Sequence, residues 1–455
     1  MFRLVVFTSI TLIACSKKEP TPRSGDGSAA VAKTDACKPG EKEGPLTWTS
    51  DDYAGALACA KQKKVPLVVD LWAPWCHTCL SMQTTVFMDA SFGADADKFI
   101  FLKMDTDKEQ NAAALQKLSI SAWPTFYVLG ADEAVLGRWI GAASLAQFHQ
   151  FLDAGALAQK GGADAATSHL LSGLRAMAVK DQATAATELD AALKAAPADY
   201  PRRAEILNSL ISTKLKAQDY PGCMQLADQH MDEMGTTSIA ADFLVTAVMC
   251  ADAAKQDAKP LREKAIARWQ KLLDSKDLSV DDRSDTMMNI REQLDKLGKK
   301  DDAKKIAEQQ RALLDQTAAA APNPLAAMTY NWPRAEVYAY LGRPLDLVPA
   351  LEKSAKDLPG EYDPRARIGW LYLQAKDAPN AAKWTDEALK LVYGPRKGGL
   401  LGRRAEIAEL ANDKASAIQF RQQQVALYEH LPEGQQQPEA LKAAKDALEK
   451  LGSTP

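Results

Sequence analysis

A short apolar run that leads directly into a cysteine pair constrains this chain more than any other stretch. Residues 67–79 read LVVDLWAPWCHTC. Residues 67–72 are rich in β-branched and aromatic side chains, which predicts a buried strand. A helical pattern begins at Cys76, where free N–H groups and the helix dipole favour a thiolate. Cys79 lies one turn further on, placed to attack a mixed disulfide. This spacing is typical of redox chemistry with an exposed attacking sulfur, Cys76, and a shielded resolving sulfur, Cys79.

The flanking residues continue as an alternation of strands and helices. Predicted strands cover residues 46–49, 99–104, 125–129 and 135–140, and predicted helices cover residues 51–64, 111–118 and 145–157. The last two strands are expected to pair antiparallel because the connection between them is short. Together these elements predict an α/β domain over residues 45–160.

Several separate motifs resemble the thioredoxin superfamily. Asp70, in VVDLW, matches the family's buried acid, which accepts the proton when the second cysteine attacks, and Lys103, in FLKMD, matches the lysine beside that acid. Trp123 and Pro124 match the cis-proline turn, which packs against the cysteine pair and receives an extended substrate. The resemblance implies a thioredoxin fold with catalytic residues Cys76, Cys79, Asp70 and Lys103 and substrate-binding residues Trp75, Trp123 and Pro124.

The segments TTVFMDASF and NAAALQKLSI resemble the C-terminal thioredoxin-like domain of DsbD-type disulfide reductases, which favours a reductase. Two features depart from the superfamily. The dipeptide between the cysteines is His77-Thr78, and Trp123 is bulkier than the usual residue before the proline. A histidine beside Cys76 either stabilises its thiolate and raises the reduction potential or points to solvent. The cysteine motif by itself therefore leaves the redox direction open.

The N-terminus is typical of a secreted protein. Residues 1–14 carry one early charge and an apolar run too short to span a bilayer, as in a signal peptide. The sequence LIAC, ending at Cys15, resembles the bacterial lipobox, which implies acylation of Cys15 and a stable membrane anchor. Ser16 implies sorting to the outer membrane, facing the periplasm; the alternative is a plain signal peptide with an incidental cysteine. Residues 15–44 are predicted to be a disordered tether.

Residues 165–452 contain many Ala/Leu/Lys/Glu/Gln segments at helical spacing and no convincing strand, which predicts an all-α region. Helix pairs recur at about the spacing of tetratricopeptide repeats, most clearly over residues 171–197 and 362–395, and resemble that family. The alternative is an irregular α-solenoid without true repeats. The resemblance implies a TPR-like solenoid with a concave surface for a protein or peptide ligand.

The cysteine positions suggest further bridges. The chain has seven cysteines, and six remain if Cys15 is acylated. Cys223 and Cys250 lie at similar distances on either side of a predicted turn, so a structural disulfide between them is favoured over two buried thiols. Cys37 and Cys59 either pair or leave Cys59 packed in the core, and the second interpretation is preferred.

Composition excludes several classes of function. A net charge of −3 with 25% charged residues implies neither nucleic-acid binding nor attraction to an acidic lipid surface. Five histidines make a multi-histidine metal site unexpected. Zinc at the cysteine pair lacks a second CxxC, and the haem motif requires histidine where Leu80 stands. No metal or cofactor is expected.

Two functions remain. The first is a lipid-anchored thiol–disulfide oxidoreductase of the bacterial cell envelope that acts on protein thiols and disulfides. The second is a scaffold lipoprotein whose repeats bind a partner while the thioredoxin-like domain is redox-silent. A combination, in which the repeats select the protein whose disulfides are processed, is favoured.

Overall fold

The computed structural model describes residues 37–120, 122–255 and 257–453. The expected signal peptide, Cys15 and most of the expected tether lie outside these residues. No helix in the described part of the chain has the length and apolarity that crossing a membrane requires.

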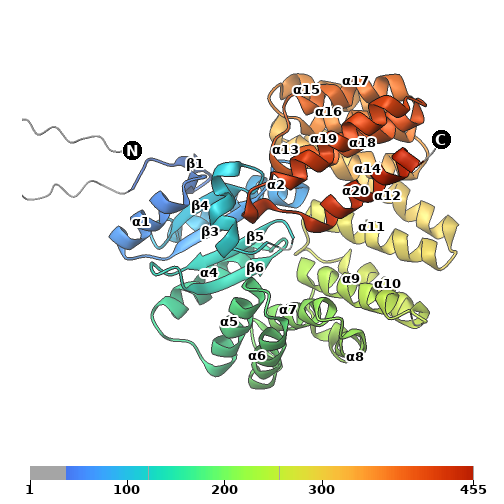
Figure 1. Cartoon of the computed structure of the whole chain (residues 1–455). Helices are drawn as coiled ribbons and strands as arrows, with labels where there is room; N and C mark the ends of the chain where they lie inside the picture. The colour runs from blue at the N-terminus through green and yellow to red at the C-terminus, as the bar shows by residue number, and fades with distance from the viewer. Residues whose placement is uncertain (1–36, 121, 256, 454–455) are drawn as a thin grey trace, which may run out of the picture. The chain divides into compact units, whose positions relative to one another are not determined.

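A mixed six-stranded sheet holds the cysteine motif, with strand order β1-β2-β4-β3-β5-β6 (Figure 1). The strands are β1 Glu41–Glu43, β2 Leu46–Ser50, β3 Leu67–Trp72, β4 Ile100–Asp105, β5 Thr125–Leu129 and β6 Val135–Ile140. β3 is central, parallel to β4 and antiparallel to β5, and β5 pairs antiparallel with β6 as predicted. β1 corrects the prediction that residues 15–44 are all tether, because it pairs with β2.

Four helices cover the two faces of the sheet: α1 Tyr53–Lys63, α2 His77–Thr84, α3 Ala112–Lys117 and α4 Leu145–Gln159. Alternate residues of β3 point to opposite faces. Val69 and Leu71 pack in one core with residues of α1 and α3, whereas Val68 packs in the other with Met82 of α2 and Phe148 of α4. This two-sided burial explains why β3 is almost continuously apolar.

The remaining elements are helical, as predicted for residues 165–452. They are α5 Ala165–Ala178, α6 Gln182–Ala195, α7 Arg203–Lys216, α8 Tyr220–His230, α9 Ser238–Ala253, α10 Lys259–Leu272, α11 Val280–Lys296, α12 Lys300–Ala320, α13 Pro324–Met328, α14 Asn331–Tyr340, α15 Val348–Asp357, α16 Asp363–Gln374, α17 Ala378–Leu389, α18 Gly394–Leu410, α19 Lys414–Glu429 and α20 Pro438–Ser453. Consecutive helices joined by short turns pack together, notably α5 with α6 and α16 with α17. These two pairs occupy the clearest predicted repeats.

Small residues allow the helices of each pair to approach closely. A Cβ atom on Gly173 would lie 2.7 Å from Leu189 Cγ, and one on Gly369 would lie 2.5 Å from Thr385 Oγ1. Both distances are too short for a side chain, so glycine is required at these two crossings. Gly173 and Gly369 are therefore points of close contact within the two helix pairs.

The helical region and the sheet share one hydrophobic core. Phe148 and Phe151 of α4 belong to the same buried cluster as Leu170 and Leu174 of α5. At the other end of the chain, Gln435 Nε2 donates a hydrogen bond to the carbonyl oxygen of Thr106, 2.8 Å away. The helical region thus contacts the sheet domain at both of its own ends.

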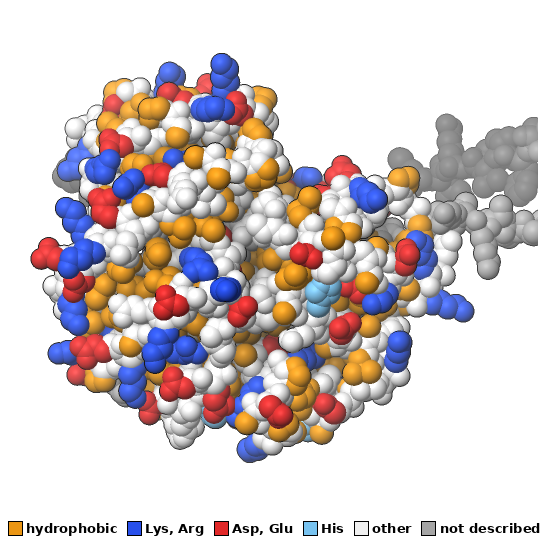
Figure 2. All heavy atoms as spheres, turned by 180° about the vertical axis from the view of Figure 1, so that it is seen from behind, with side chains coloured by type: hydrophobic (Ala, Val, Ile, Leu, Met, Phe, Trp, Pro, Cys, Tyr) orange, Lys and Arg blue, Asp and Glu red, His pale blue; other side chains and the backbone are white. Residues whose placement is uncertain are grey.

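On the face that Figure 2 shows, acidic and basic side chains are interspersed.

Candidate functional site

The cysteine pair lies where β3 ends and α2 begins. Cys76 and Cys79 form a disulfide with 5.2 Å between their Cα atoms. Cys76 is the N-cap of α2, and its Sγ accepts a hydrogen bond from the backbone N–H of Cys79 at 3.0 Å. In the reduced protein the same N–H and the helix dipole would stabilise a Cys76 thiolate.

The proline turn packs against this disulfide. The Trp123–Pro124 peptide bond is cis, as the resemblance implied. Trp123 packs on the cluster formed by Ala73 and the two cysteines, and its ring lies 4.9 Å from that of Trp75. Gly141 N–H donates to the carbonyl oxygen of Pro124 at 2.9 Å, which ties the turn to the end of β6.

Asp70 is buried in the centre of the sheet. Its side chain is 1% exposed, and its Oδ1 has no hydrogen-bond partner. Burial raises the pKa of Asp70 to about 7, against the lowering effects of the neighbouring Gln83 amide and of the charge on Lys103. A carboxylate that titrates near neutral pH can take a proton from a thiol and release it again.

Lys103 lies beside Asp70 in the register of β3 and β4. Its ammonium group, however, forms an ion pair with Glu43 of β1 and lies 3.8 Å from Glu41. Lys103 therefore acts on Asp70 through its charge, while its hydrogen bond goes to a strand that the sequence analysis did not predict.

Both sulfurs are buried, which contradicts the expectation of one exposed sulfur. Cys76 is 4% exposed and Cys79 is 1% exposed. The helical region contacts Trp75, which packs on the same cluster as the two sulfurs. Arg396 of α18 lies over the Trp75 ring, 4.8 Å from its centre, and Arg367 of α16 donates to the Trp75 carbonyl oxygen at 3.4 Å.

Two acids, Asp105 at the end of β4 and Asp107 just after it, also contact this side of the site, and the sequence analysis missed both. Trp75 Nε1 donates to Asp107 Oδ2 at 2.8 Å, and Tyr393 donates its hydroxyl to Asp105. Burial raises the pKa of Asp107 to about 7, against the lowering effect of the Trp75 hydrogen bond. No local sequence signal marked Tyr393, because its partner lies 288 residues away.

His77 points into the helical region instead of solvent. Its Nδ1 lies 2.8 Å from Asp281 Oδ1 at the start of α11. Burial opposes a charge on the imidazole, but Asp281 and Asp285 outweigh it and raise the pKa of His77 to about 9. The acidic run VDDRSD, residues 280–285, could have indicated this contact, although such runs usually lie in the solvated first turn of a helix.

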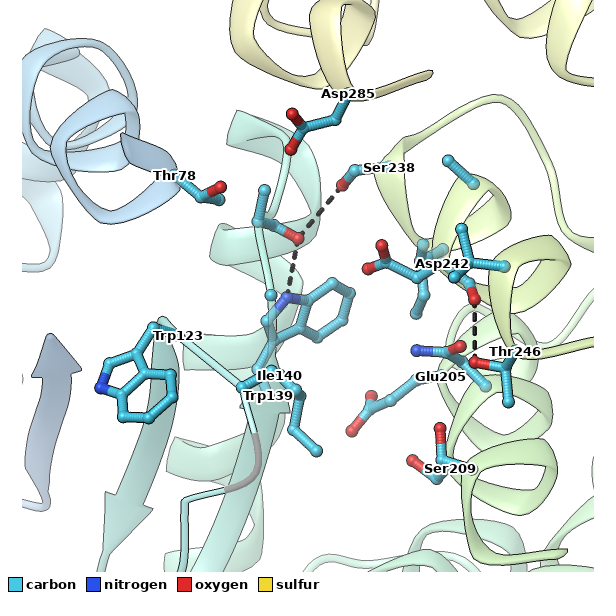
Figure 3. Close-up of a pocket in the computed structure, with 18 of the residues that line it drawn as sticks. Thr78, Trp123, Trp139, Ile140, Glu205, Ser209, Ser238, Asp242, Thr246 and Asp285 are labelled. Atoms are coloured by element: carbon cyan, nitrogen blue, oxygen red, sulfur yellow. Dashed lines mark hydrogen bonds between the residues drawn. The ribbon is translucent and has the colours of Figure 1, made fainter. Parts of the chain in front are cut away.

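A cavity of about 430 Å³ opens beside the proline turn (Figure 3). Trp123, Ile140 and Gly141 line it from the sheet domain, and Asp242 and Asp285 are among the residues that line it from the helical region. Arg138 and Lys216 line the same cavity, so its wall carries charges of both signs.

The structure forms two further disulfides. Cys223 is bonded to Cys250, which was the favoured pairing, with a Cα–Cα distance of 6.3 Å. Cys37 is bonded to Cys59, which corrects the preferred interpretation that Cys59 only packs in the core. The pairing was missed because Cys37 was assigned to the tether, whereas it lies just before β1.

Comparisons with known proteins match the sheet domain to thioredoxin-like proteins. The thioredoxin-like family model matches residues 47–131. A thioredoxin H-type of Chlamydomonas reinhardtii is 42% identical over 72 residues, 16% of this chain and 60% of that protein. The thiol:disulfide interchange protein DsbD of Vibrio vulnificus is 32% identical over 71 residues, 15% of this chain and 12% of that protein.

A rice chloroplastic thioredoxin-like protein, CITRX, is 28% identical over 118 residues, which cover 24% of this chain and 60% of that protein. The chain thus spans less than two thirds of the length of these relatives. A tetratricopeptide repeat protein from Parabacteroides merdae covers 64% of this chain and 99% of its own length, at a TM-score of 0.42 and 11% identity. Residues 47–131 of this chain form a thioredoxin-like domain, and a long array of helix pairs follows it.

Proposed function

We propose that the chain is a protein thiol–disulfide oxidoreductase that cycles between the Cys76–Cys79 disulfide and the dithiol. The observation that supports this most is the placement of the disulfide at the N-terminus of α2, packed against Trp123 of the cis-proline turn. Asp70 adds a buried carboxylate with a pKa near 7 on the strand that leads to the same helix.

The proposed reaction is disulfide reduction. The Cys76 thiolate attacks one sulfur of a partner's disulfide, and the other partner sulfur leaves as a thiolate that takes up a proton. Asp70 accepts the Cys79 proton while Cys79 attacks Cys76 Sγ, so the second partner sulfur leaves as a thiolate. Two electrons pass from the dithiol to the partner, and an external dithiol protein is required to reduce Cys76–Cys79 again.

The helical region is proposed to choose the partner. It contacts the ring and the backbone carbonyl oxygen of Trp75 and forms one wall of the cavity beside the proline turn. A partner that binds the helix array would therefore be presented to the disulfide, and the buried sulfurs would be protected from other thiols.

The proposed location rests on the N-terminal sequence. The apolar run and the LIAC motif at Cys15 support acylation and anchoring in a bacterial cell envelope, with the folded part in the periplasm. Metabolic labelling with a radioactive fatty acid tests this, since labelling is expected in the native chain and absent in Cys15→Ala.

Thiol trapping and insulin reduction test the redox proposal. The reduced chain is expected to reduce insulin, Cys76→Ser is expected to have no activity, and Cys79→Ser is expected to accumulate a mixed disulfide through Cys76. Cys223→Ser with Cys250→Ser is the matched control, because that disulfide lies in the helical region.

The burial of both sulfurs favours one competing function, a scaffold with a redox-silent domain. Under that function the native chain and Cys76→Ser would reduce insulin equally slowly, and no mixed disulfide would form. This result would overturn the oxidoreductase proposal.

A further inference from the structure

We propose that His77, Asp281 and Asp285 form a binding site for a divalent transition-metal ion of the Zn²⁺ or Mn²⁺ type, between α2 and α11. His77 is the first residue of α2. Asp281 and Asp285 are four residues apart on α11 and therefore share one helix face. This site does not depend on the proposed redox function.

The three side chains already have nearly the spacing of metal ligands. One ligand atom from each lies within 4.8 Å of the other two. His77 Nδ1 and Asp281 Oδ1 are 2.8 Å apart. Ligands that lie about 2.0–2.2 Å from a common ion are roughly 3 Å from one another, so only a small movement of Asp285 completes the set.

An unpartnered oxygen points independently to a ligand. Asp281 is 1% exposed, and its Oδ2 has no hydrogen-bond partner. A buried carboxylate oxygen without a partner is costly, since nothing replaces the water that it loses. Its Oδ1 lies at hydrogen-bond distance from His77 Nδ1, so an ion that replaces the proton between them would be bound by Nδ1 and by the Asp281 carboxylate, including Oδ2.

The charge around the site is unbalanced. Asp242 and Asp282 line the same cavity as Asp285 and, with Asp281, bring four carboxyl groups to this region; Arg138 and Lys216 also line the cavity. Within the described part of the chain, no lysine or arginine forms an ion pair with any of these four acids. A divalent cation would supply the missing positive charge.

The cavity provides an entry path and open coordination positions. Figure 3 shows the carboxylate of Asp285 directed into the space between Thr78 and Asp242. A hydrated ion can reach Asp285 from this cavity of about 430 Å³ and keep water ligands there. An imidazole nitrogen among carboxylate oxygens favours Zn²⁺ or Mn²⁺ over Mg²⁺ and Ca²⁺, which prefer oxygen ligands alone.

The ion would fasten two distant parts of the chain. His77 and Asp281 are 204 residues apart, and they belong to the sheet domain and the helical region respectively. Because binding requires both parts in place, the metal would stabilise the packing of the helical region beside the Cys76–Cys79 disulfide.

The test is a metal titration of the purified, oxidised full-length chain at pH 8. Oxidation matters because the sulfurs of a disulfide cannot serve as thiolate ligands. Calorimetry with Zn²⁺ and electron paramagnetic resonance with Mn²⁺ are expected to give one ion per chain, and saturating Zn²⁺ is expected to raise the thermal midpoint. Mg²⁺ and Ca²⁺ are expected to bind at least tenfold more weakly.

The variants His77→Gln and Asp285→Asn are expected to weaken binding at least tenfold and to abolish the rise in thermal midpoint. Asp285 forms no ion pair in the described structure, so Asp285→Asn leaves the contact between His77 and Asp281 intact if His77→Gln fails to fold. Asp301→Asn, an exposed acid on α12, is the control and is expected to bind like the native chain. Absence of saturable binding, or equal affinity in Asp285→Asn, would overturn the site.

Discussion

The Cys76–Cys79 disulfide faces two regions of the molecule that are built differently. On the sheet side, Asp70 lies on β3 itself, buried, with one carboxylate oxygen unpartnered. On the helical side, the contacts are made by charged residues such as Arg367 and Arg396 that come from remote helices. One side carries a group that can exchange a proton, and we expect the other, through Trp75, to limit access to the sulfurs.

The difference shows how chemistry and access are divided along this chain. The elements on the sheet side come from adjacent strands of one sheet and from the helix that follows β3. The contacts that we expect to limit access join residues as much as 292 positions apart, as between Trp75 and Arg367. Changes on the two sides should therefore have separable effects on proton transfer and on exposure of the sulfurs.

The largest effects are expected from Asp70→Asn. Loss of the base should slow formation of the Cys76–Cys79 disulfide from a mixed disulfide about 10²-fold at pH 8, and remove a rate increase centred near pH 7. Stopped-flow measurements across pH 5–9 would check this. A retained inflection near pH 7 would assign the proton transfer to another group.

The same variant should change how stability depends on pH. The pKa of Asp70 rises from its ordinary value of 3.8 to about 7 in the folded chain, so the folded state binds the proton more tightly. Stability from this group is therefore lost as pH rises from about 4 to about 7, by at most about 4 kcal/mol. Urea unfolding of the oxidised protein should show a flatter pH profile for Asp70→Asn.

The next largest effect is expected in the helical region, at a disulfide away from Trp75 and the Cys76–Cys79 site. Replacing Cys223 and Cys250 together by serine removes a bridge that closes a 27-residue separation, and should lower the free energy of unfolding by about 3 kcal/mol. Insulin reduction at 25 °C should not change. A parallel loss of activity would mean that this bridge also supports the disulfide site.

A smaller effect is expected from Arg396→Met, which removes the cation above the Trp75 ring. Because a cation over an aromatic ring contributes about 1 kcal/mol, alkylation of Cys76 in the reduced chain should become roughly threefold to tenfold faster. Arg404→Met is the matched control, because Arg404 lies 4.6 Å from the Phe420 ring elsewhere in the array. Equal alkylation rates in the native chain and both variants would show that Arg396 does not limit access to Cys76.

The smallest effect is expected from Lys103, whose charge acts on Asp70 from the sheet side. Lys103→Met should raise the pKa of Asp70 further, since the lysine charge lowers it and its hydrogen bond goes to Glu43. The rate inflection near pH 7 should move upward by less than about one unit. If the inflection does not move, the role of Lys103 is limited to its structural contact with β1.

The sheet side was largely predictable from the sequence, because local patterns determine it. The strand at residues 67–72 and both β5 and β6 have their predicted bounds, since their apolar runs end at clear turn residues. β1 escaped prediction because EKE has no strand pattern of its own and is held by pairing with β2 and by Lys103.

The helical side was predictable only as a class of structure. Periodicity identified the helix pairs, but it carries no information on which helix packs against α2. The contact of His77 with Asp281 and the cavity beside the proline turn depend on that packing. An exposed sulfur was expected from the position of Cys76 at a helix start, whereas the structure packs both cysteines with Ala73, Trp72, Trp75 and Trp123.

The Cys37–Cys59 bridge determines how the folded part would respond to mechanical tension. β1 and β2 lie between these two cysteines, inside the covalent loop that the bridge closes. A pull on the chain ahead of Cys37 would pass through the sulfur–sulfur bond into α1 and bypass both strands. Force applied at the proposed anchor would therefore not separate β1 and β2 from the sheet. Reduction of the Cys37–Cys59 disulfide would remove that protection.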